Sequence, residues 1–286
     1  MDQFPRTTVG GMSVSRLIIG SNWFNGYSHT TAAKDELIKE LMDRKRVADV
    51  IEVFFRAGVD TFMGPKNQLM FDAIHDAEDR TGAKGIVICT PTLTTTPRTP
   101  FDGFDIGEVE RILDDMVKCG ATFCMPHQCT TDAMVDRCAR QIRKMDTVCR
   151  MIRERDMIPG LSTHMPESII YADESGLDVE SYIAIYNSMG FLMQIEVDWV
   201  ARVINEAKKP VMTIKPLAAG QLRPLQGLTF VWNTIRPQDM VTIGCMSPRE
   251  AAEVIELSLN ILERMPASMQ LQETRSKASV KPKKTA

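Results

Sequence analysis

The sequence RVADVIEVFFRAGVDTFM, residues 46–63, contains an amphipathic segment, a glycine that can end a helix and a short apolar run. The apolar side chains of the first part repeat at helical spacing, at Val47, Val50, Ile51, Phe54 and Phe55. One apolar stripe of this kind predicts a helix packed on a core, and Gly58 is a typical residue after a helix end. The run over 59–63 then predicts a strand buried on both faces.

This helix–strand unit recurs about eight times along the chain. The predicted strands are residues 17–20, 59–63, 85–90, 122–125, 158–162, 191–197, 211–215 and 240–244. Short apolar strands alternating with amphipathic helices indicate a parallel sheet wrapped by helices, and eight repeats favour closure. We therefore predict an α/β fold, a TIM (β/α)8 barrel, over residues 1–268. Residues 269–286 are expected to form a disordered tail, because large apolar residues are nearly absent there.

Composition narrows the class of function. The 34 Lys and Arg against 37 Asp and Glu give a net charge of −3, so there is no basic field to attract nucleic acid. No run of eighteen apolar residues occurs, which argues against a membrane span. Seven cysteines without a C-x-x-C pair suggest free thiols in a cytoplasmic protein. A small-molecule substrate is the expected partner, with a homo-oligomer possible.

Ionisable residues stand in or at the ends of several predicted strands. In a barrel of this kind the active site lies where the strands lead into the following helices. Glu196 and Lys215 interrupt or end apolar runs, and Asp60 lies in another. Such groups either form a buried structural ion pair or serve as acid, base and substrate-binding cation.

Two of the four histidines, His127 and His164, follow consecutive predicted strands. Together with Glu196 they would supply the two imidazoles and one carboxylate that bind a divalent metal. The alternative is a pair of rim histidines bonded to loop carbonyls. In the first loop Trp23, Phe24 and Tyr27 would form either an apolar wall for a substrate or a plug.

Several motifs, taken in order, resemble those of the aldo-keto reductases. They are TVGGMSVSRLIIG at 8–20, AGVDT at 57–61, GLST at 160–163, PLAAGQL at 216–222 and IGCMS at 243–247, the last followed by Arg249. The resemblance spans residues 7–260 and implies the barrel of that family, with a short hairpin closing its floor. It also implies carbonyl reduction by NADPH with a tetrad of Asp, Tyr, Lys and His.

The resemblance is incomplete at the catalytic positions. Asp60 matches the family's Asp, and His127 lies near the position of its His, but Phe62-Met63 stands where the Tyr is expected. Cys89-Thr90-Pro91 stands where the Lys is expected. The loss of a general acid typically costs about 10²–10⁴-fold in rate. Lys66 or Lys215 are the possible substitutes.

The resemblance also indicates residues for the cofactor. Ser162 and Gln194 match positions that hold the nicotinamide amide. The last loop would hold a phosphate through Gly244, Ser247 and Arg249.

Three functions therefore remain open from the sequence. The first is an enzyme without the tetrad, acting on a sugar-acid-like or keto-acid-like substrate by acid/base or metal-assisted lyase or isomerase chemistry. Its catalytic residues would be Glu196, His164, His127, Lys215 and Asp60. The second is an NADP(H)-dependent oxidoreductase with a rebuilt proton donor, and the third a non-catalytic binding protein.

Overall fold

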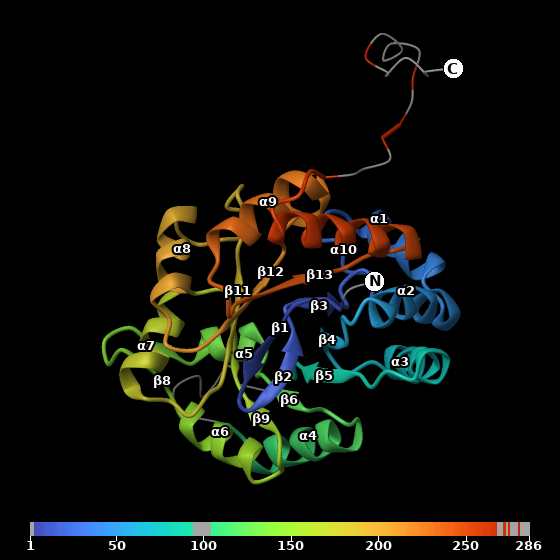
Figure 1. The fold of residues 1–286 in the computed structure, drawn as a ribbon. Helices are drawn as coiled ribbons and strands as arrows, with labels where there is room; N and C mark the ends of the chain where they lie inside the picture. The colour runs from blue at the N-terminus through green and yellow to red at the C-terminus, as the bar shows by residue number, and fades with distance from the viewer. Residues whose placement is uncertain (1–2, 94–103, 268–270, 273, 275–279, 281–286) are drawn as a thin grey trace, which may run out of the picture.

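The strands form a closed parallel barrel with helices outside it (Figure 1). The computed structural model describes residues 3–93, 104–267, 271–272, 274 and 280. Its barrel strands are β3 (Leu17–Gly20), β4 (Thr61–Gly64), β5 (Ile86–Cys89), β6 (Phe123–Cys124), β9 (Ile158–Pro159), β10 (Leu161–Thr163), β11 (Tyr182–Ile185), β12 (Val211–Ile214) and β13 (Met240–Ile243). Residues 94–103 and most of the predicted tail, residues 269–286, lie outside the described residues.

Closure of the barrel depends on Gly160, which lies between β9 and β10. On one side β9 pairs with β6, and on the other β10 pairs with β11, so the two short strands act as one that changes partner. A Cβ at Gly160 would lie 2.4 Å from Met125 Cε and 2.8 Å from the Ser181 carbonyl oxygen. Counting β9 and β10 as one, the sheet has the predicted eight-stranded (β/α)8 order.

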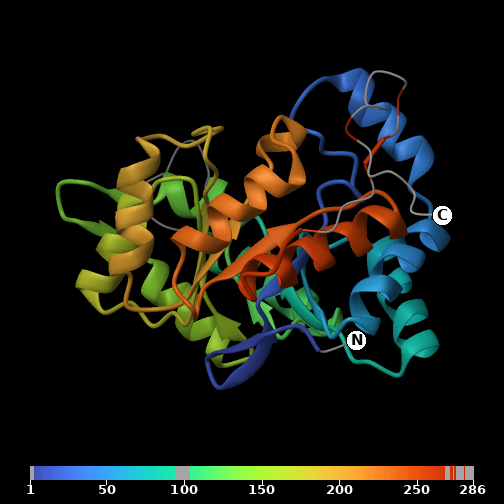
Figure 2. The same ribbon diagram turned by 45° about the horizontal axis from the view of Figure 1, so that its top comes forward.

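Helices surround the strands on all sides, as the turned view in Figure 2 also shows. They are α1 (Ala32–Leu41), α2 (Arg44–Arg56), α3 (Gln68–Thr81), α4 (Ile106–Lys118), α5 (Gln128–Ala133), α6 (Met145–Arg153), α7 (Glu167–Ser175), α8 (Val197–Glu206), α9 (Pro224–Thr234) and α10 (Pro248–Leu262). The α2 helix confirms the stripe predicted from residues 46–56. Asp43 caps its N-terminus, because the Asp43 side chain accepts a hydrogen bond from the Arg46 N–H group at 2.7 Å.

Two apolar layers stabilise this arrangement. The interior of the barrel holds strand residues such as Ile18, Phe123 and Met212, while a larger layer packs the helices on the outer face of the sheet. The interior layer also includes Val9 and Val14, from the antiparallel hairpin β1 (Arg6–Val9) and β2 (Met12–Ser15). The hairpin therefore closes the floor of the barrel, the end at which the strands begin, as expected from the resemblance.

The sixth barrel strand does not lie where the sequence predicted it. Residues 191–197 form turns and the start of α8, and the strand is β11 (Tyr182–Ile185). The true strand is rich in β-branched and aromatic residues and follows the C-terminal glycine of α7, Gly176, by a short link. The segment over 191–197 is apolar but largely solvent-exposed, so its apolar run misled the prediction.

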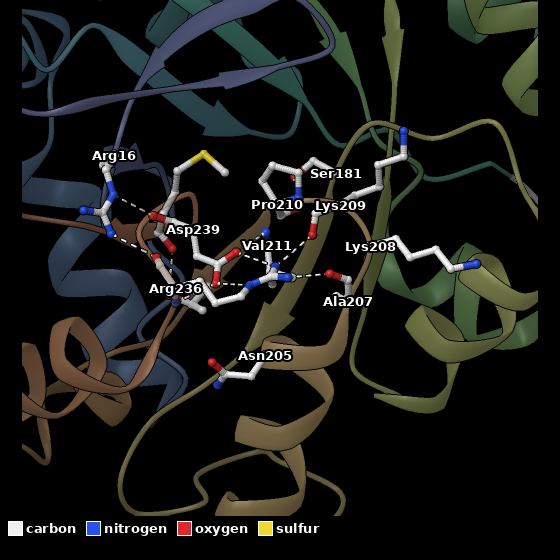
Figure 3. Close-up of polar contacts among 12 residues, drawn as sticks. Arg16, Ser181, Asn205, Ala207, Lys208, Lys209, Pro210, Val211, Arg236 and Asp239 are labelled. Atoms are coloured by element: carbon white, nitrogen blue, oxygen red, sulfur yellow. Dashed lines mark hydrogen bonds and ion pairs between the residues drawn. The ribbon is translucent and has the colours of Figure 1, made fainter.

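A buried network of charges joins the strands at the floor (Figure 3). The Asp239 carboxylate is fully buried and accepts hydrogen bonds from the Arg236 guanidinium at 2.7 Å and 2.9 Å and from the Val211 N–H group at 2.8 Å. Arg236 also donates to the Ala207 and Lys209 carbonyl oxygens, and Arg16 donates to the Asp239 carbonyl oxygen at 3.0 Å. These contacts connect β3, β12 and β13 where the strands begin.

Across the described part of the chain, none of the helices combines the length and apolar character that crossing a bilayer requires.

Candidate functional site

A cavity of about 790 Å³ opens at the other end of the barrel, where the strands lead into the following helices. It is lined by the ends of β3, β4, β10, β12 and β13 and by the loops after them. This volume is typical of small-molecule sites, and the C-terminal end of the strands is where barrel enzymes carry out their chemistry. The cavity is therefore the candidate active site.

Lys215 follows directly after β12 and lines the cavity. Its backbone has a φ of 61°, in the left-handed region that a non-glycine residue adopts at a cost. This conformation ends the strand abruptly, and the partly buried side chain remains in the mouth. Burial lowers the pKa of Lys215 to about 8, because the apolar surroundings disfavour the charged ammonium.

His29, from the loop before α1, contacts Lys215. Its Nε2 atom lies 2.8 Å from Lys215 Nζ and 3.0 Å from Asn22 Nδ2. An ammonium and an amide nitrogen can only donate, so His29 Nε2 is the acceptor when Lys215 is charged. Partial burial and the nearby Lys215 charge lower the pKa of His29, against the opposite influence of Asp35. Lys215 Nζ and His29 Nε2 therefore share one proton, which can pass between the amine and the imidazole.

The predicted residues His127 and His164 line the same cavity, as the sequence suggested. Burial and then the Lys215 charge lower the pKa of both, and the pKa of His164 falls to about 4. His164 is consequently neutral at neutral pH and able to accept a proton. His127 begins α5, and its Nδ1 atom lies 3.1 Å from the Cys129 sulfur.

Asp132 on α5 fixes the position of His164. Its carboxylate accepts a hydrogen bond from Thr163 Oγ1 at 2.5 Å and from the His164 N–H group at 3.0 Å. Burial raises the pKa of Asp132. Sequence reasoning missed this residue, because it lies on a short helix 32 residues before His164, and no local spacing links the two.

Three of the four histidines and two lysines, Lys34 and Lys215, thus line one cavity. Among the described lining residues the single carboxylate is Glu250, which belongs to the helix start beyond β13. No carboxylate of the described chain lies within ion-pair distance of Lys215. A cavity with bases, an ammonium and so little negative charge favours an anionic ligand.

The corrected position of the sixth strand removes two predicted residues from the site. Glu196 is exposed at the start of α8, Gln194 is exposed in the loop before it, and neither lines the cavity. The residue that β11 contributes is Ile183. No group of three metal-ligating side chains occurs within the described residues, so His127, His164 and Glu196 do not assemble the predicted metal site.

Asp60 also lies away from the cavity. It stands at the start of β4, on the floor, where its carboxylate pairs with the Arg6 guanidinium of the hairpin at 2.9 Å. The expectation that it takes the place of the tetrad Asp was wrong, because the strand runs on for four residues before it reaches the mouth. The β4 residue that lines the cavity is Met63. Lys66 is paired with Asp115 at 3.1 Å and is not part of the cavity lining.

The residues predicted to bind NADP are only partly assembled. Ser162 and Gly244 line the cavity, but Arg249 is exposed and does not, and Ser247 caps α10 by accepting the Glu250 N–H group at 3.2 Å. The Glu250 carboxylate accepts the Met246 N–H group at 2.7 Å. The Glu250 carboxylate therefore uses a backbone N–H group of the loop that was expected to bind a phosphate, and these residues do not fit a dinucleotide as a set.

The aromatic residues of the first loop were expected to form either an apolar wall for a substrate or a plug, and they do not all take the same place. Trp23 and Tyr27 line the cavity, whereas Phe24 is buried and stacks on Phe62. Trp23 packs against Gly244, where a Cβ would lie 2.6 Å from Trp23 Cδ1. The first loop thus supplies an apolar wall of the cavity through Trp23 and Tyr27.

Comparison with known proteins supports the fold. No protein-family model matches the chain, and no curated protein matches it in sequence. Among solved structures, a protein from Pseudomonas aeruginosa that is assigned as an aldo-keto reductase matches with a TM-score of 0.65 and 14% identity, over 91% of this chain and 98% of that one. The chain has the aldo-keto reductase fold.

Two further structures show how far that likeness reaches. An aldo-keto reductase from a Medee basin deep-sea metagenome library matches with a TM-score of 0.57 and 8% identity, over 94% of this chain and 98% of that one. A truncated 3-deoxy-D-arabino-heptulosonate 7-phosphate synthase from Thermotoga maritima matches with a TM-score of 0.52 and 9% identity, over 92% and 90%. Barrels with different chemistry are thus similar to this chain, so its reaction must be inferred from the site itself.

Proposed function

We propose that this protein is an enzyme that removes a proton next to the carbonyl group of a small anionic substrate, a 2-oxo acid or a sugar acid. The observation that supports it is the cluster of Lys215, His29, His127 and His164 in one cavity, with a single carboxylate in its described lining. A carbon-bound proton next to a carbonyl becomes acidic enough to transfer when a base and a positive charge are held beside it.

Each residue has a role that follows from its position. Lys215 supplies the positive charge next to the developing enolate. His164 is the base, because its ring is neutral at neutral pH and makes no hydrogen bond with the described residues. Asp132 acts on His164 only through the backbone, so it is a positioning residue.

The substrate class follows from the charge and walls of the cavity. The carboxylate of a 2-oxo acid would lie among the cationic and imidazole groups, and the short carbon chain against Trp23, Ile183 or Ile214. The rest of the volume extends toward the Gly244 loop, which leaves room for a longer polyhydroxy chain. This accounts for the sugar-acid alternative.

Proton exchange into deuterated water tests the proposal directly. Loss of the proton NMR signals next to the carbonyl is followed for pyruvate, 2-oxobutyrate and 2-oxogluconate. We expect exchange well above the buffer rate for at least one acid, and loss of that exchange in Lys215→Met. The Lys66→Met variant is the matched control, because Lys66 is paired with Asp115 away from the cavity. No exchange with any of the three acids would contradict the proposal.

A second candidate is an NADP(H)-dependent oxidoreductase, favoured by the fold and by the extension of the cavity from Lys215 to the Gly244 loop. Titration with NADPH, followed by protein fluorescence, separates the two. Micromolar quenching together with carbonyl-dependent NADPH oxidation would favour the oxidoreductase. Ligand binding that survives Lys215→Met and His164→Ala, without exchange or oxidation, would instead indicate a non-catalytic binding protein.

A further inference from the structure

We infer that Lys215 forms a covalent imine with the carbonyl carbon of the substrate, so that its nitrogen, and not its charge alone, carries out the reaction. This inference rests on the proposed function and specifies its mechanism. It is drawn from the position of Lys215 at the mouth of the barrel, from its contact with His29 and from the absence of a carboxylate partner within the described chain.

The environment of Lys215 differs from that of a lysine that serves only as a cation. A cationic lysine held for its charge is normally paired or well hydrated, as Lys66 is with Asp115. Lys215 instead lies among apolar groups such as Ile183, Ile214 and Trp23, with an imidazole as its one hydrogen-bond partner in the described residues. Apolar surroundings favour the neutral amine, which is the nucleophilic form.

His29 provides the route for the proton. The 2.8 Å contact between Lys215 Nζ and His29 Nε2 allows one ammonium proton to pass to the imidazole. The freed Nζ lone pair adds to the carbonyl carbon, and the electrons of the C=O bond move to the oxygen. The positively charged nitrogen of this adduct gives one of its two protons to the oxygen, which becomes a hydroxyl. His29 then returns its proton to this hydroxyl, which leaves as water while the C=N bond forms.

The step balances without a further reactant. An ammonium and a carbonyl give a protonated imine and one water, with no change in charge or oxidation state. The protonated imine attracts the electrons of the adjacent C–H bond, so His164 removes that proton and an enamine forms. The same intermediate would accept electrons from an adjacent C–C bond, which is the chemistry of a lyase.

Borohydride trapping tests the inference. Sodium borohydride reduces an imine to a stable secondary amine, so protein incubated with pyruvate and borohydride should gain the mass of one reduced pyruvate. Peptide mapping should place this group on Lys215. We expect the adduct in the unmodified protein and in Lys66→Met, and none in Lys215→Met or Lys215→Arg.

The arginine variant separates nucleophile from charge. An arginine keeps the positive charge but stays protonated, so it cannot form an imine. If Lys215 acts by imine formation, Lys215→Arg should lose proton exchange by about 10²–10⁴-fold, as Lys215→Met does. Circular dichroism and thermal unfolding identify any variant that fails to fold, and the trapping result in Lys66→Met remains informative in either case.

The possible results are distinguishable. Exchange without an adduct, or a Lys215→Arg variant that retains exchange within about tenfold, would overturn the imine and leave the proposed function intact. An adduct of equal yield in Lys215→Met would also overturn it, because other lysines, such as Lys34 in the same cavity, would account for the trapping. Neither exchange nor adduct would overturn both proposals. An adduct without exchange would support the imine and contradict proton removal.

Discussion

The two ends of the barrel differ in whether their ionisable groups have partners of opposite charge. At the floor, charges are matched, with the buried Asp239 against Arg236 and the partly exposed Asp60 against Arg6. At the mouth, Lys215 has an imidazole for a partner and no carboxylate among the described residues.

This difference separates stability from function. A buried charge that has a partner and filled hydrogen bonds is tolerated, and removing one member of such a pair is strongly destabilising. A group left without a counter-charge has a shifted pKa, which costs folding energy but produces a reactive base or amine. The floor of this barrel therefore maintains the fold, and the mouth carries the groups suited to catalysis.

The largest stability effect is expected at the floor. In Arg236→Met the Asp239 carboxylate stays buried but loses its guanidinium partner, so the free energy of unfolding should fall by about 3–5 kcal/mol. Urea unfolding measures this change. Proton exchange per folded molecule should be unaffected, and a selective loss of exchange with unchanged stability would contradict the separation of the two ends.

The next effect is expected at the mouth. His164→Gln removes the proposed base and should slow exchange by about 10²-fold while the fold is retained. The matched control is His75→Gln, because His75 is exposed on α3 and contacts Glu78. If both variants exchange at the rate of the unmodified protein, His164 is not the base.

The charge of Lys215 should weaken the fold. Its pKa in the folded chain is about 8, below the ordinary value of 10.5, so the unfolded chain binds the proton more tightly. Lys215→Met should therefore raise the free energy of unfolding by about 1–3 kcal/mol below pH 8. As the pH rises from 8 to 10.5, the folded protein loses the charged amine and the two stabilities should converge. Urea unfolding at several pH values measures this, and a gain that is independent of pH would point to packing alone.

The smallest effect is expected at Asp60. Asp60→Asn keeps a hydrogen-bond acceptor for Arg6 but removes a partly exposed ion pair, so the loss should be about 1 kcal/mol or less. Exchange should stay unchanged, because Asp60 lies at the end of β4 opposite the cavity. A large loss of exchange would restore Asp60 to the catalytic residues.

Local patterns explain which parts of the fold could be predicted. The stripe of α2 and the apolar run of β4 depend on neighbours in the sequence, so their periodicity is visible without the structure. The sixth strand was misplaced because residues 191–197 are apolar too, and only packing shows that they remain exposed.

The residues of the candidate site also divide into those that local sequence could predict and those that it could not. Lys215, His127 and His164 were found because strand ends meet at one mouth in any barrel of this kind. Ser162 was found through the resemblance to the aldo-keto reductases. Asp60 was misplaced because a strand's sequence does not show which of its residues reach the mouth. His29 was missed because its partner lies 186 residues further along the chain, and no local spacing links them.

The sequence by itself determined the alternation of helix and strand, the closed barrel and the list of ionisable groups near strand ends, since these follow from periodicity and from the parallel order of the strands. Only the tertiary structure decided which of those groups are paired, because pairing depends on distances between segments far apart in the chain. Burial then sets the pKa of each group, and burial is a property of the packed molecule.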